Sequence, residues 1–209
     1  MIDPVLLAGI DQLSLPETVA APLNAYINEV KIFNPLYGLV ATTENFAVRH
    51  VLDSLAPWKL LADRCGDCAH IADIGSGAGL PGIPLAIVLA SYSFVLIERS
   101  SRRAAFLHHT INALRLDNVT VYEGEMESYA LPQFDCVVFR AFHPLEKKLV
   151  RKLFRLVKIG GFIGAYKGKA QAIHSELSAL KGEIGMCELL DVAVPFLSES
   201  RHLVTLTHA

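Results

Sequence analysis

Hydrophobic residues follow two different spacings along this chain, and the change comes near Ala69. In residues 1–60 they recur every three or four positions, the spacing of one face of an α-helix. Later they gather in short runs separated by longer amphipathic stretches. We therefore expect residues 1–60 to form a helical cap that packs on a main domain of residues 61–209, with no flexible linker between them.

Two helices are predicted within the cap. The first is expected to begin at Pro16-Glu17 and to end at Asn34-Pro35, because proline disfavours continuation of a helix. The second is expected to follow a cap at Thr42 or Thr43 and to carry the apolar residues Phe46, Val48, Val51, Leu52 and Leu55.

After Ala69, strand-like and helix-like segments alternate. Strands are predicted at His70–Ile74, Phe94–Ile97, Val119–Tyr122, Phe134–Phe139 and Gly161–Tyr166, and helices at Leu80–Ala90, Arg102–Leu116, Leu145–Lys158 and Ala170–Lys181. Such alternation indicates an α/β fold, with a parallel sheet covered by helices on both faces. The last two runs, Met186–Val194 and His202–Thr207, have no long helix between them, so they are expected to add an antiparallel hairpin at the sheet edge and to complete seven strands.

The segment Ile71–Leu85 reads IADIGSGAGLPGIPL and indicates a cofactor site. Glycine lets the backbone turn tightly and approach a ligand that a side chain would exclude. Pro81 and Pro84 fit the first turn of the following helix, whose first N–H groups have no partner within the helix. The segment therefore predicts a strand, a loop and a helix N-terminus around a nucleotide-type cofactor, with loop glycines at Gly75, Gly77, Gly79 and Gly82.

Asp73 distinguishes between two classes of cofactor. The stretch Gly77–Gly82 matches G-x-G-x-x-G, so a nicotinamide-dependent oxidoreductase is one interpretation. A carboxylate at the mouth of the loop would repel a pyrophosphate, whereas it would attract the ammonium and sulfonium groups of S-adenosylmethionine, which has no phosphate. Asp73 thus favours S-adenosylmethionine. A simpler role, as a hydrogen-bond acceptor that orients the loop, stays open.

Further candidates follow the next two strands. Glu98 ends the second strand, where its carboxylate can accept both hydroxyls of a ribose; an ion pair with Arg99 or Arg102 is the alternative. The segment Glu125-Met126-Glu127 follows the third strand, where a loop can contact an adenine edge.

Arg140 directly follows the apolar strand Phe134–Phe139, at the edge of the sheet where open α/β folds bind their ligands. A partly buried arginine needs a partner, which favours a functional role. Lys167 and Lys169 follow the next strand and add positive charge at the same edge.

Composition narrows the classes of protein. Hydrophobic residues make up 52% and the mean hydropathy is +0.38, but the longest uncharged run contains four glycines and two prolines, so we interpret it as loop, helix and strand rather than a membrane span. The N-terminus lacks the positive segment of a signal peptide, and we expect a cytoplasmic protein with no membrane partner. The net charge of −2 means that nucleic-acid affinity requires a local positive patch.

Cysteine and histidine spacing argues against metal chemistry. Cys65 and Cys68 form C-x-x-C, but a structural zinc site needs two further ligands at matching spacing. The histidines show no metal-ligand spacing, and no serine or cysteine lies in a nucleophile elbow. We therefore expect no metal and no hydrolytic activity.

Several motifs together resemble the bacterial ribosomal small-subunit methyltransferase G family, also called glucose-inhibited division protein B. The resemblance extends from about Asn24 to Leu206. Its specific pieces are Arg49-His-Val-Leu-Asp-Ser54, the loop Asp73–Pro84, Phe134-Asp135 with Arg140-Ala141, Lys167-Gly168 and Arg201-His-Leu203.

The resemblance implies a Rossmann-like class I S-adenosylmethionine-dependent methyltransferase that acts on N7 of a guanine in the 530 loop of 16S rRNA, within the 30S subunit. We expect a monomer. By position, cofactor contacts fall on Gly75, Leu80, Met126, Glu127 and Arg140, supported by Asp73 and Glu98. Arg49, His50, Lys167 and Arg201 match positions that shape the target pocket or bind RNA, and Arg140 and Lys167 are the expected catalytic residues.

Guanine N7 has a free lone pair and carries no proton, so its methylation needs no general base. Positioning alone can supply roughly 7–11 kcal/mol of the barrier. Arginine commonly donates to both O6 and N7 of guanine, but a donor on N7 would block the attack. Arg140 or a neighbour is therefore expected to hold O6 or a phosphate and to leave N7 free.

Two stretches depart from the family. Many relatives carry a tryptophan-asparagine pair and Asn-Leu-Thr where this chain has Ile32–Tyr37, and Glu125 stands where relatives often have arginine. The first departure affects the substrate-facing cap, and the second affects an RNA or cofactor contact. Two alternatives remain, a methyltransferase of this fold with a small-molecule or protein substrate and a non-catalytic, ribosome-associated module that binds the cofactor.

Overall fold

The computed structural model describes residues 1–42, 44–130, 133–141 and 144–209. They form a seven-stranded sheet with the order β3-β2-β1-β4-β5-β7-β6. The strands are β1 (His70–Ile74), β2 (Ser93–Glu98), β3 (Val119–Glu123), β4 (Phe134–Arg140), β5 (Val157–Lys167), β6 (Cys187–Val192) and β7 (Arg201–Thr207). Strands β1 to β5 pair in parallel, and β7 lies antiparallel between β5 and β6. The predicted α/β fold with its antiparallel edge hairpin is confirmed.

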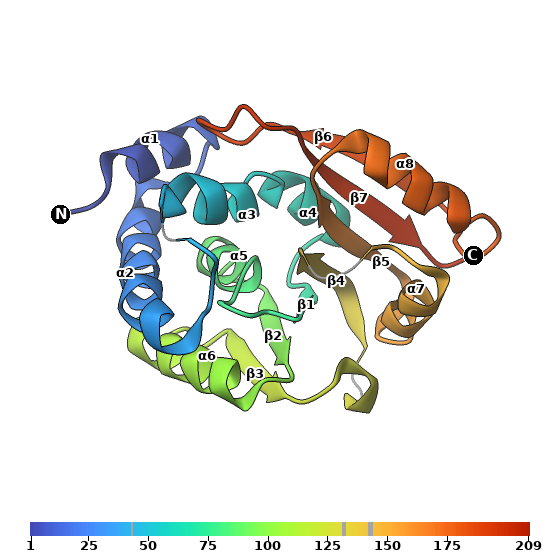
Figure 1. The fold of residues 1–209 in the computed structure, drawn as a ribbon, viewed down its shortest axis with the longest axis horizontal. Coiled ribbons are helices and arrows are strands. Elements are labelled where there is room, and N and C mark those ends of the chain that lie inside the picture. Colours follow the sequence, from blue (N-terminus) through green and yellow to red (C-terminus); the bar gives the residue numbers. More distant parts are fainter. Residues whose placement is uncertain (43, 131–132, 142–143) are drawn as a thin grey trace.

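Helices cover both faces of this sheet (Figure 1). The first segment forms α1 (Pro4–Gln12), η1 (Glu17–Val19), α2 (Ala20–Tyr37), the π-helix η2 (Ala47–Leu52), α3 (Asp53–Leu55) and α4 (Trp58–Cys65). The later helices are α5 (Gly82–Val88), α6 (Ser101–Leu114), η3 (Met126–Ser128), α7 (Lys147–Phe154) and α8 (Ala170–Ala179).

Alternate residues of the central strands supply two separate cores, because successive strand side chains point to opposite faces. Ile71 and Phe94 belong to a core shared with the N-terminal helices, α5 and α6. Ala72 and Val95 belong to a second core beneath α7 and α8. In Figure 1 the blue helices α1 and α2 accordingly lie with green α6, away from orange α7 and α8.

The predicted end of the first long helix is wrong. The helix continues through Pro35 to Tyr37 and ends where Gly38 adopts a left-handed conformation, φ +60°. Gly38 donates its N–H to the carbonyl of Asn34 (2.9 Å), and the Asn34 side chain accepts the N–H of Val40 (2.9 Å). Glycine at the C-terminus decides the end point, since it adopts this conformation without steric cost.

The second predicted helix differs in type and in its start. The Thr42 side chain accepts the N–H of Glu44 (3.1 Å), whereas the next helix, η2, begins only at Ala47, so Thr42 is not its cap. The alternative cap, Thr43, lies outside the described residues. The chain then forms η2 and α3 in place of one α-helix. The hydrophobic spacing indicated a helix but not its π geometry, which is rare and often marks functional sites.

Two further boundaries differ from their predicted positions, and two helices were not predicted. The helix expected over Leu145–Lys158 ends at Phe154, because the N–H of Phe134 bonds to the carbonyl of Leu156 (2.7 Å) and draws the next residues into β5. Strand β5 therefore begins before its predicted start at Gly161. Helices α1 and α4 were not predicted as separate elements.

The predicted boundary between cap and main domain falls inside α4, so the division into two domains stays a prediction. The two parts share the first core. Tyr26 of α2 is fully buried and donates its hydroxyl hydrogen to the carbonyl of Ala78 in the glycine loop (2.8 Å). Of the helices that the described residues form, none has the length and hydrophobicity needed to cross a bilayer.

We predict that Tyr26→Phe lowers the free energy of unfolding by about 1–2 kcal/mol, because the buried carbonyl of Ala78 loses its donor. Denaturant titration measures the change. Tyr37→Phe, at the half-buried end of the same helix, is the control and should change stability by less than about 0.5 kcal/mol. Equal effects of the two substitutions would contradict a specific role for the Tyr26 hydroxyl.

Candidate active site

Two adjoining cavities open at the carboxyl ends of the parallel strands. The larger one, about 650 Å³, lies beyond β4 and β5 and also borders η2 and β7. The smaller one, about 440 Å³, lies beyond β1, β2 and β3. Ala141 lines both, so a ligand in one cavity lies next to a ligand in the other.

The glycine loop borders the smaller cavity through Gly75. Gly75, Gly77 and Gly79 all have positive φ (67°, 57° and 89°), a conformation that other residues adopt only with strain. A Cβ on Gly79 would also lie 2.4 Å from the Ile83 side chain, so this glycine allows α5 to pack closely. Gly77, Gly79 and Leu80 shape the loop without lining either cavity.

Asp73 is fully buried at the end of β1. Its Oδ2 accepts the N–H of Gly82 (2.9 Å), while its Oδ1 has no hydrogen-bond partner among the described residues. Burial raises the pKa of this carboxyl to about 7, although the Gly82 N–H and the charge of Arg140 oppose the shift. The structure therefore gives Asp73 the loop-orienting contact and leaves one of its oxygens unpaired.

Glu98 lines the smaller cavity and is 4% exposed. Its two carboxylate oxygens accept the N–H groups of Gly77 (2.9 Å) and Ser100 (2.9 Å). The alternative ion pairs are not formed, since Arg99 pairs with Glu125 (3.4 Å) and Arg102 donates to a backbone carbonyl. Glu98 thus joins the glycine loop to the end of β2 beside the cavity.

The segment after β3 forms the far wall of the smaller cavity. Met126 is buried, and Glu127 forms an ion pair with Lys152 of α7. Hydrogen bonding from Lys152 lowers the pKa of the Glu127 carboxyl. Glu125 also lines this cavity and carries the exposed ion pair with Arg99. The departure from the family at Glu125 therefore lies at the rim of the smaller cavity.

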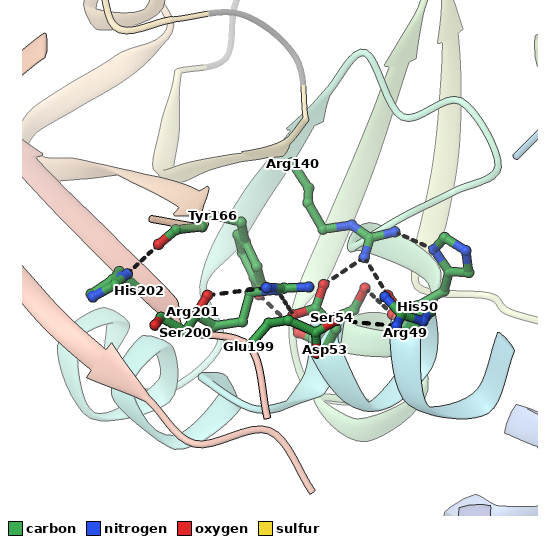
Figure 2. Close-up of polar contacts among 11 residues, drawn as sticks. Arg49, His50, Asp53, Ser54, Arg140, Tyr166, Glu199, Ser200, Arg201 and His202 are labelled. Atoms are coloured by element: carbon green, nitrogen blue, oxygen red, sulfur yellow. Dashed lines mark hydrogen bonds and ion pairs between the residues drawn. The ribbon is translucent and has the colours of Figure 1, made fainter. Parts of the chain in front are cut away.

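Arg140 projects from the end of β4 into the larger cavity and is held by three neighbouring residues (Figure 2). Its Nη1 donates to Oδ2 of Asp53 (2.8 Å) and to the carbonyl of Arg49 (3.1 Å). Its Nη2 donates to Nδ1 of His50 (3.0 Å). These acceptors all come from η2 and the first residue of α3, so the partner that a half-buried arginine requires is Asp53.

His50 is neutral at physiological pH. Burial lowers the pKa of its ring to about 4, and the adjacent Arg140 guanidinium lowers it further. The neutral ring accepts from Arg140 at Nδ1, which leaves its Nε2–H to donate to the carbonyl of Thr42 (3.3 Å). Both ring nitrogens are therefore engaged.

Three other predicted side chains that line the larger cavity each form an ion pair with an acidic residue. Arg201 donates from Nε to Oδ1 of Asp53 (3.0 Å), Arg49 pairs with Glu199 (3.1 Å), and Lys167 pairs with Glu176 (2.6 Å). The structure thus brings together Arg49, His50, Arg140, Lys167 and Arg201, which lie far apart in the sequence.

Sequence reasoning missed the acids that organise this cavity. Asp53 belongs to the motif Arg49–Ser54, but we predicted no role for it from the sequence. Its place four residues after Arg49 puts both residues on neighbouring turns of a helix. Glu176 and Glu199 carry no local signal, because each acts on a residue from a different element. Tyr166, which lines the cavity and donates to the carbonyl of Ser54 (2.9 Å), was missed likewise.

The four cysteines are all free: Cys65 is half-buried, Cys136 is buried, and Cys68 and Cys187 are exposed. Within the described ranges, no group of three or more His, Cys, Asp or Glu side chains is arranged to hold a metal ion.

Comparison with known proteins shows the family of the chain. A sequence profile of the family rRNA small subunit methyltransferase G matches residues 20–204. The ribosomal RNA small subunit methyltransferase G of Treponema pallidum is 38% identical over 194 residues, which cover 90% of this chain and 85% of that protein. The chain belongs to this family. A member from Cronobacter sakazakii is 35% identical and covers 93% of this chain and 91% of its own. The resemblance inferred from the motifs is confirmed.

Solved structures show the same fold at low sequence identity. The human methyltransferase 10 domain containing protein superposes with a TM-score of 0.62 at 12% identity, over 89% of this chain and 96% of that one. A tRNA (m1A58) methyltransferase from Aquifex aeolicus gives a TM-score of 0.59 at 12% identity, over 74% and 69%. The fold is that of the class I S-adenosylmethionine-dependent methyltransferases.

We predict that Asp73→Asn removes a pH-dependent loss of stability. Between its unfolded pKa of 3.8 and its folded value of about 7, Asp73 binds more protons in the folded state. Its contribution to stability is therefore full below 3.8 and is lost as the pH rises through 7. Unfolding measured without cofactor at pH 5 and pH 8 should show the variant gaining roughly 2–4 kcal/mol relative to wild type. A difference that does not change with pH would contradict the raised pKa.

Proposed function

We propose that this chain transfers a methyl group from S-adenosylmethionine to N7 of a guanine in the 530 loop of 16S rRNA, with the 30S subunit or a precursor of it as substrate. Membership of an rRNA small subunit methyltransferase family supports the reaction class and the RNA. The family resemblance implies N7 as the acceptor atom, and the chemistry of the larger cavity agrees with it.

The smaller cavity suits S-adenosylmethionine, which when bound supplies a methyl group activated on a sulfonium. Glu98 lies at the end of β2 with acceptor oxygens that suit a ribose, and buried Met126 offers an apolar contact for an adenine. A bound cation would lower the raised pKa of Asp73 and keep its carboxylate charged, so this buried group beside the loop favours a cation over a pyrophosphate. Gly75 lines this cavity without a side chain.

The observation that carries the proposal is the lack of a free base among the described residues of the larger cavity. Asp53 is paired with two arginines, and both nitrogens of His50 are engaged. Both nitrogens of His202 are engaged as well, with the carbonyl of Gly168 and with Asp191 (3.2 Å). Such a cavity suits an acceptor atom that carries no proton. Guanine N7 is one, because its lone pair can receive the methyl group without any deprotonation.

Arg140 and Lys167 are the proposed catalytic residues, since both line the larger cavity beside Ala141, where the cavities meet. Their positive charges suit the phosphates and oxygens of an RNA strand. Arg49 and Arg201 border the same cavity and are proposed to contact the RNA. The proposed mechanism depends on orientation of the guanine rather than on proton transfer, a contribution that can reach roughly 7–11 kcal/mol.

The decisive experiment incubates the protein with methyl-labelled S-adenosylmethionine and 30S subunits from a strain that lacks it. We expect one N7-methylguanine, located in the 530 loop. Arg140, expected from the resemblance to contact the cofactor, lines the larger cavity and not the smaller one. Arg140→Ala should therefore retain cofactor binding and lose at least about tenfold in turnover, the effect of about 1.4 kcal/mol of lost orientation. Label elsewhere, or on another atom, would overturn the proposal, and full turnover by Arg140→Ala would overturn the role of that residue.

Cofactor binding is tested separately. Because ligand binding stabilises the folded state, S-adenosylhomocysteine should raise the Tm and NAD should not. Glu98→Gln should weaken S-adenosylhomocysteine about tenfold, since a hydrogen bond to a charged acceptor contributes about 1.5 kcal/mol or more. Glu123→Gln, on the neighbouring strand and exposed, is the control and should leave the Kd unchanged. A Tm increase with NAD alone would contradict the cofactor assignment.

A further inference from the structure

One buried carboxylate holds two guanidinium groups at the wall of the larger cavity. Asp53 is the first residue of α3, and its side chain is 8% exposed. Its Oδ2 accepts from Arg140 Nη1 (2.8 Å) and its Oδ1 from Arg201 Nε (3.0 Å). Figure 2 shows the Asp53 carboxylate between the two arginines. Since Arg140 ends β4 and Arg201 begins β7, this contact joins a helix to two strands that do not pair with each other.

The three side chains carry an uncompensated positive charge. One carboxylate faces two guanidinium groups, whereas the other cations of the cavity, Arg49 and Lys167, each have an acid of their own, Glu199 and Glu176. Neutral His50 adds no charge. Excess positive charge at a half-buried site attracts an anion, because partial burial weakens screening by water and salt.

The hydrogen bonds of Arg140 also determine which of its donors remain available. Nη1 uses its two hydrogens for Asp53 and the carbonyl of Arg49, and Nη2 uses one for His50. Nε–H and the second hydrogen of Nη2 have no partner within the part of the chain that the structure describes. In a guanidinium, Nε–H and one hydrogen of Nη2 form an edge whose spacing matches two oxygens of a phosphate group.

We propose that Asp53 is a positioning residue that assembles Arg140 and Arg201 into a site for one backbone phosphate of the RNA. The proposal rests on the proposed function, since it assigns a role to one wall of the same cavity. With its free edge on a phosphate and its other donors on η2 and α3, Arg140 has no donor left for guanine N7, and that atom stays open to the methyl group.

Burial distinguishes this ion pair from that of Arg49 with Glu199, while Lys167 and Glu176 form a pair of similar burial (13% and 18% exposed). Arg140 and Asp53 are 16% and 8% exposed, whereas Arg49 and Glu199 are 45% and 47% exposed. An exposed pair contributes little and exchanges readily with solvent, but a buried pair keeps its geometry because a separated charge would remain poorly hydrated. Glu199→Gln is therefore a matched control, as it removes the acid from an arginine of the same cavity without disturbing the buried cluster.

The direct test is a titration with inorganic phosphate, followed by NMR of the arginine Nε–Hε signals. In wild type and in Glu199→Gln, phosphate should shift the signals of Arg140 and Arg201; in Asp53→Asn these shifts should fall at least tenfold at the same concentration. This result does not depend on methyl transfer, so it separates failure of this inference from failure of the proposed function. Equal shifts in Asp53→Asn and wild type would overturn the inference, as would shifts in neither.

The second test measures kcat, the KM for S-adenosylmethionine and the pKa of the His50 ring. Asp53→Asn should lower kcat on 30S subunits at least tenfold and leave the KM for S-adenosylmethionine unchanged, while Glu29→Gln, at the ion pair with His109 outside both cavities, should change kcat less than threefold. If Asp53 positions Arg140, the pKa of His50 should rise from about 4 in Asp53→Asn, because the guanidinium moves away from the ring. Loss of the Asp53 charge alone would lower this pKa, so a fall would overturn the inference.

Asp53→Glu is a second variant that tests the inference if Asp53→Asn does not fold. It keeps the charge that the two half-buried arginines require, but its extra methylene displaces the carboxylate. We expect it to fold, to bind S-adenosylhomocysteine as wild type does, and to lose kcat in the same direction as Asp53→Asn. Wild-type kcat together with wild-type phosphate shifts in Asp53→Glu would overturn the inference even if Asp53→Asn is unfolded.

Discussion

The carboxylate of Asp53 connects the N-terminal helices to the catalytic edge of the sheet. It accepts from one arginine at the end of β4 and from another at the start of β7, and the same arginine of β4 reaches back to the backbone of η2. Separating a buried pair of this kind typically costs about 3–5 kcal/mol, since it leaves a charge with neither water nor a counter-ion. The larger cavity keeps its shape because these elements cannot move independently.

A second connection joins the same helices to the cofactor loop. Tyr26 donates to the carbonyl of Ala78, and its ring packs on Phe46 (6.3 Å between centroids), which in turn packs on His50 (4.7 Å). The helices before β1 therefore contact both the glycine loop and the ring that accepts from Arg140. The two cavities thus share one set of supporting helices, which contact both the glycine loop and the wall of the larger cavity.

The charge distribution at the sheet edge agrees with a transfer between a cationic cofactor and an anionic RNA. Acidic side chains, Asp73 and Glu98, surround the glycine loop, while arginines and a lysine line the larger cavity. The charged groups of the larger cavity are held by ion pairs or hydrogen bonds, which suits a reaction that requires orientation and no base. The net charge of −2 does not reveal this separation of positive and negative side chains, because it is a sum over the whole chain.

Sequence by itself determined the alternation of strands and helices after Ala69, the glycine loop and the position of Glu98, since hydrophobic period and glycine chemistry act over a few neighbouring residues. It identified Arg140 as a residue that needs a partner, but not the partner. Tertiary structure decided that Asp53 serves both Arg140 and Arg201, that α2 continues past Pro35, and that η2 forms a π-helix. Those outcomes depend on which elements pack together, and ion pairs between residues about 90 to 150 positions apart leave no periodic signal in the chain.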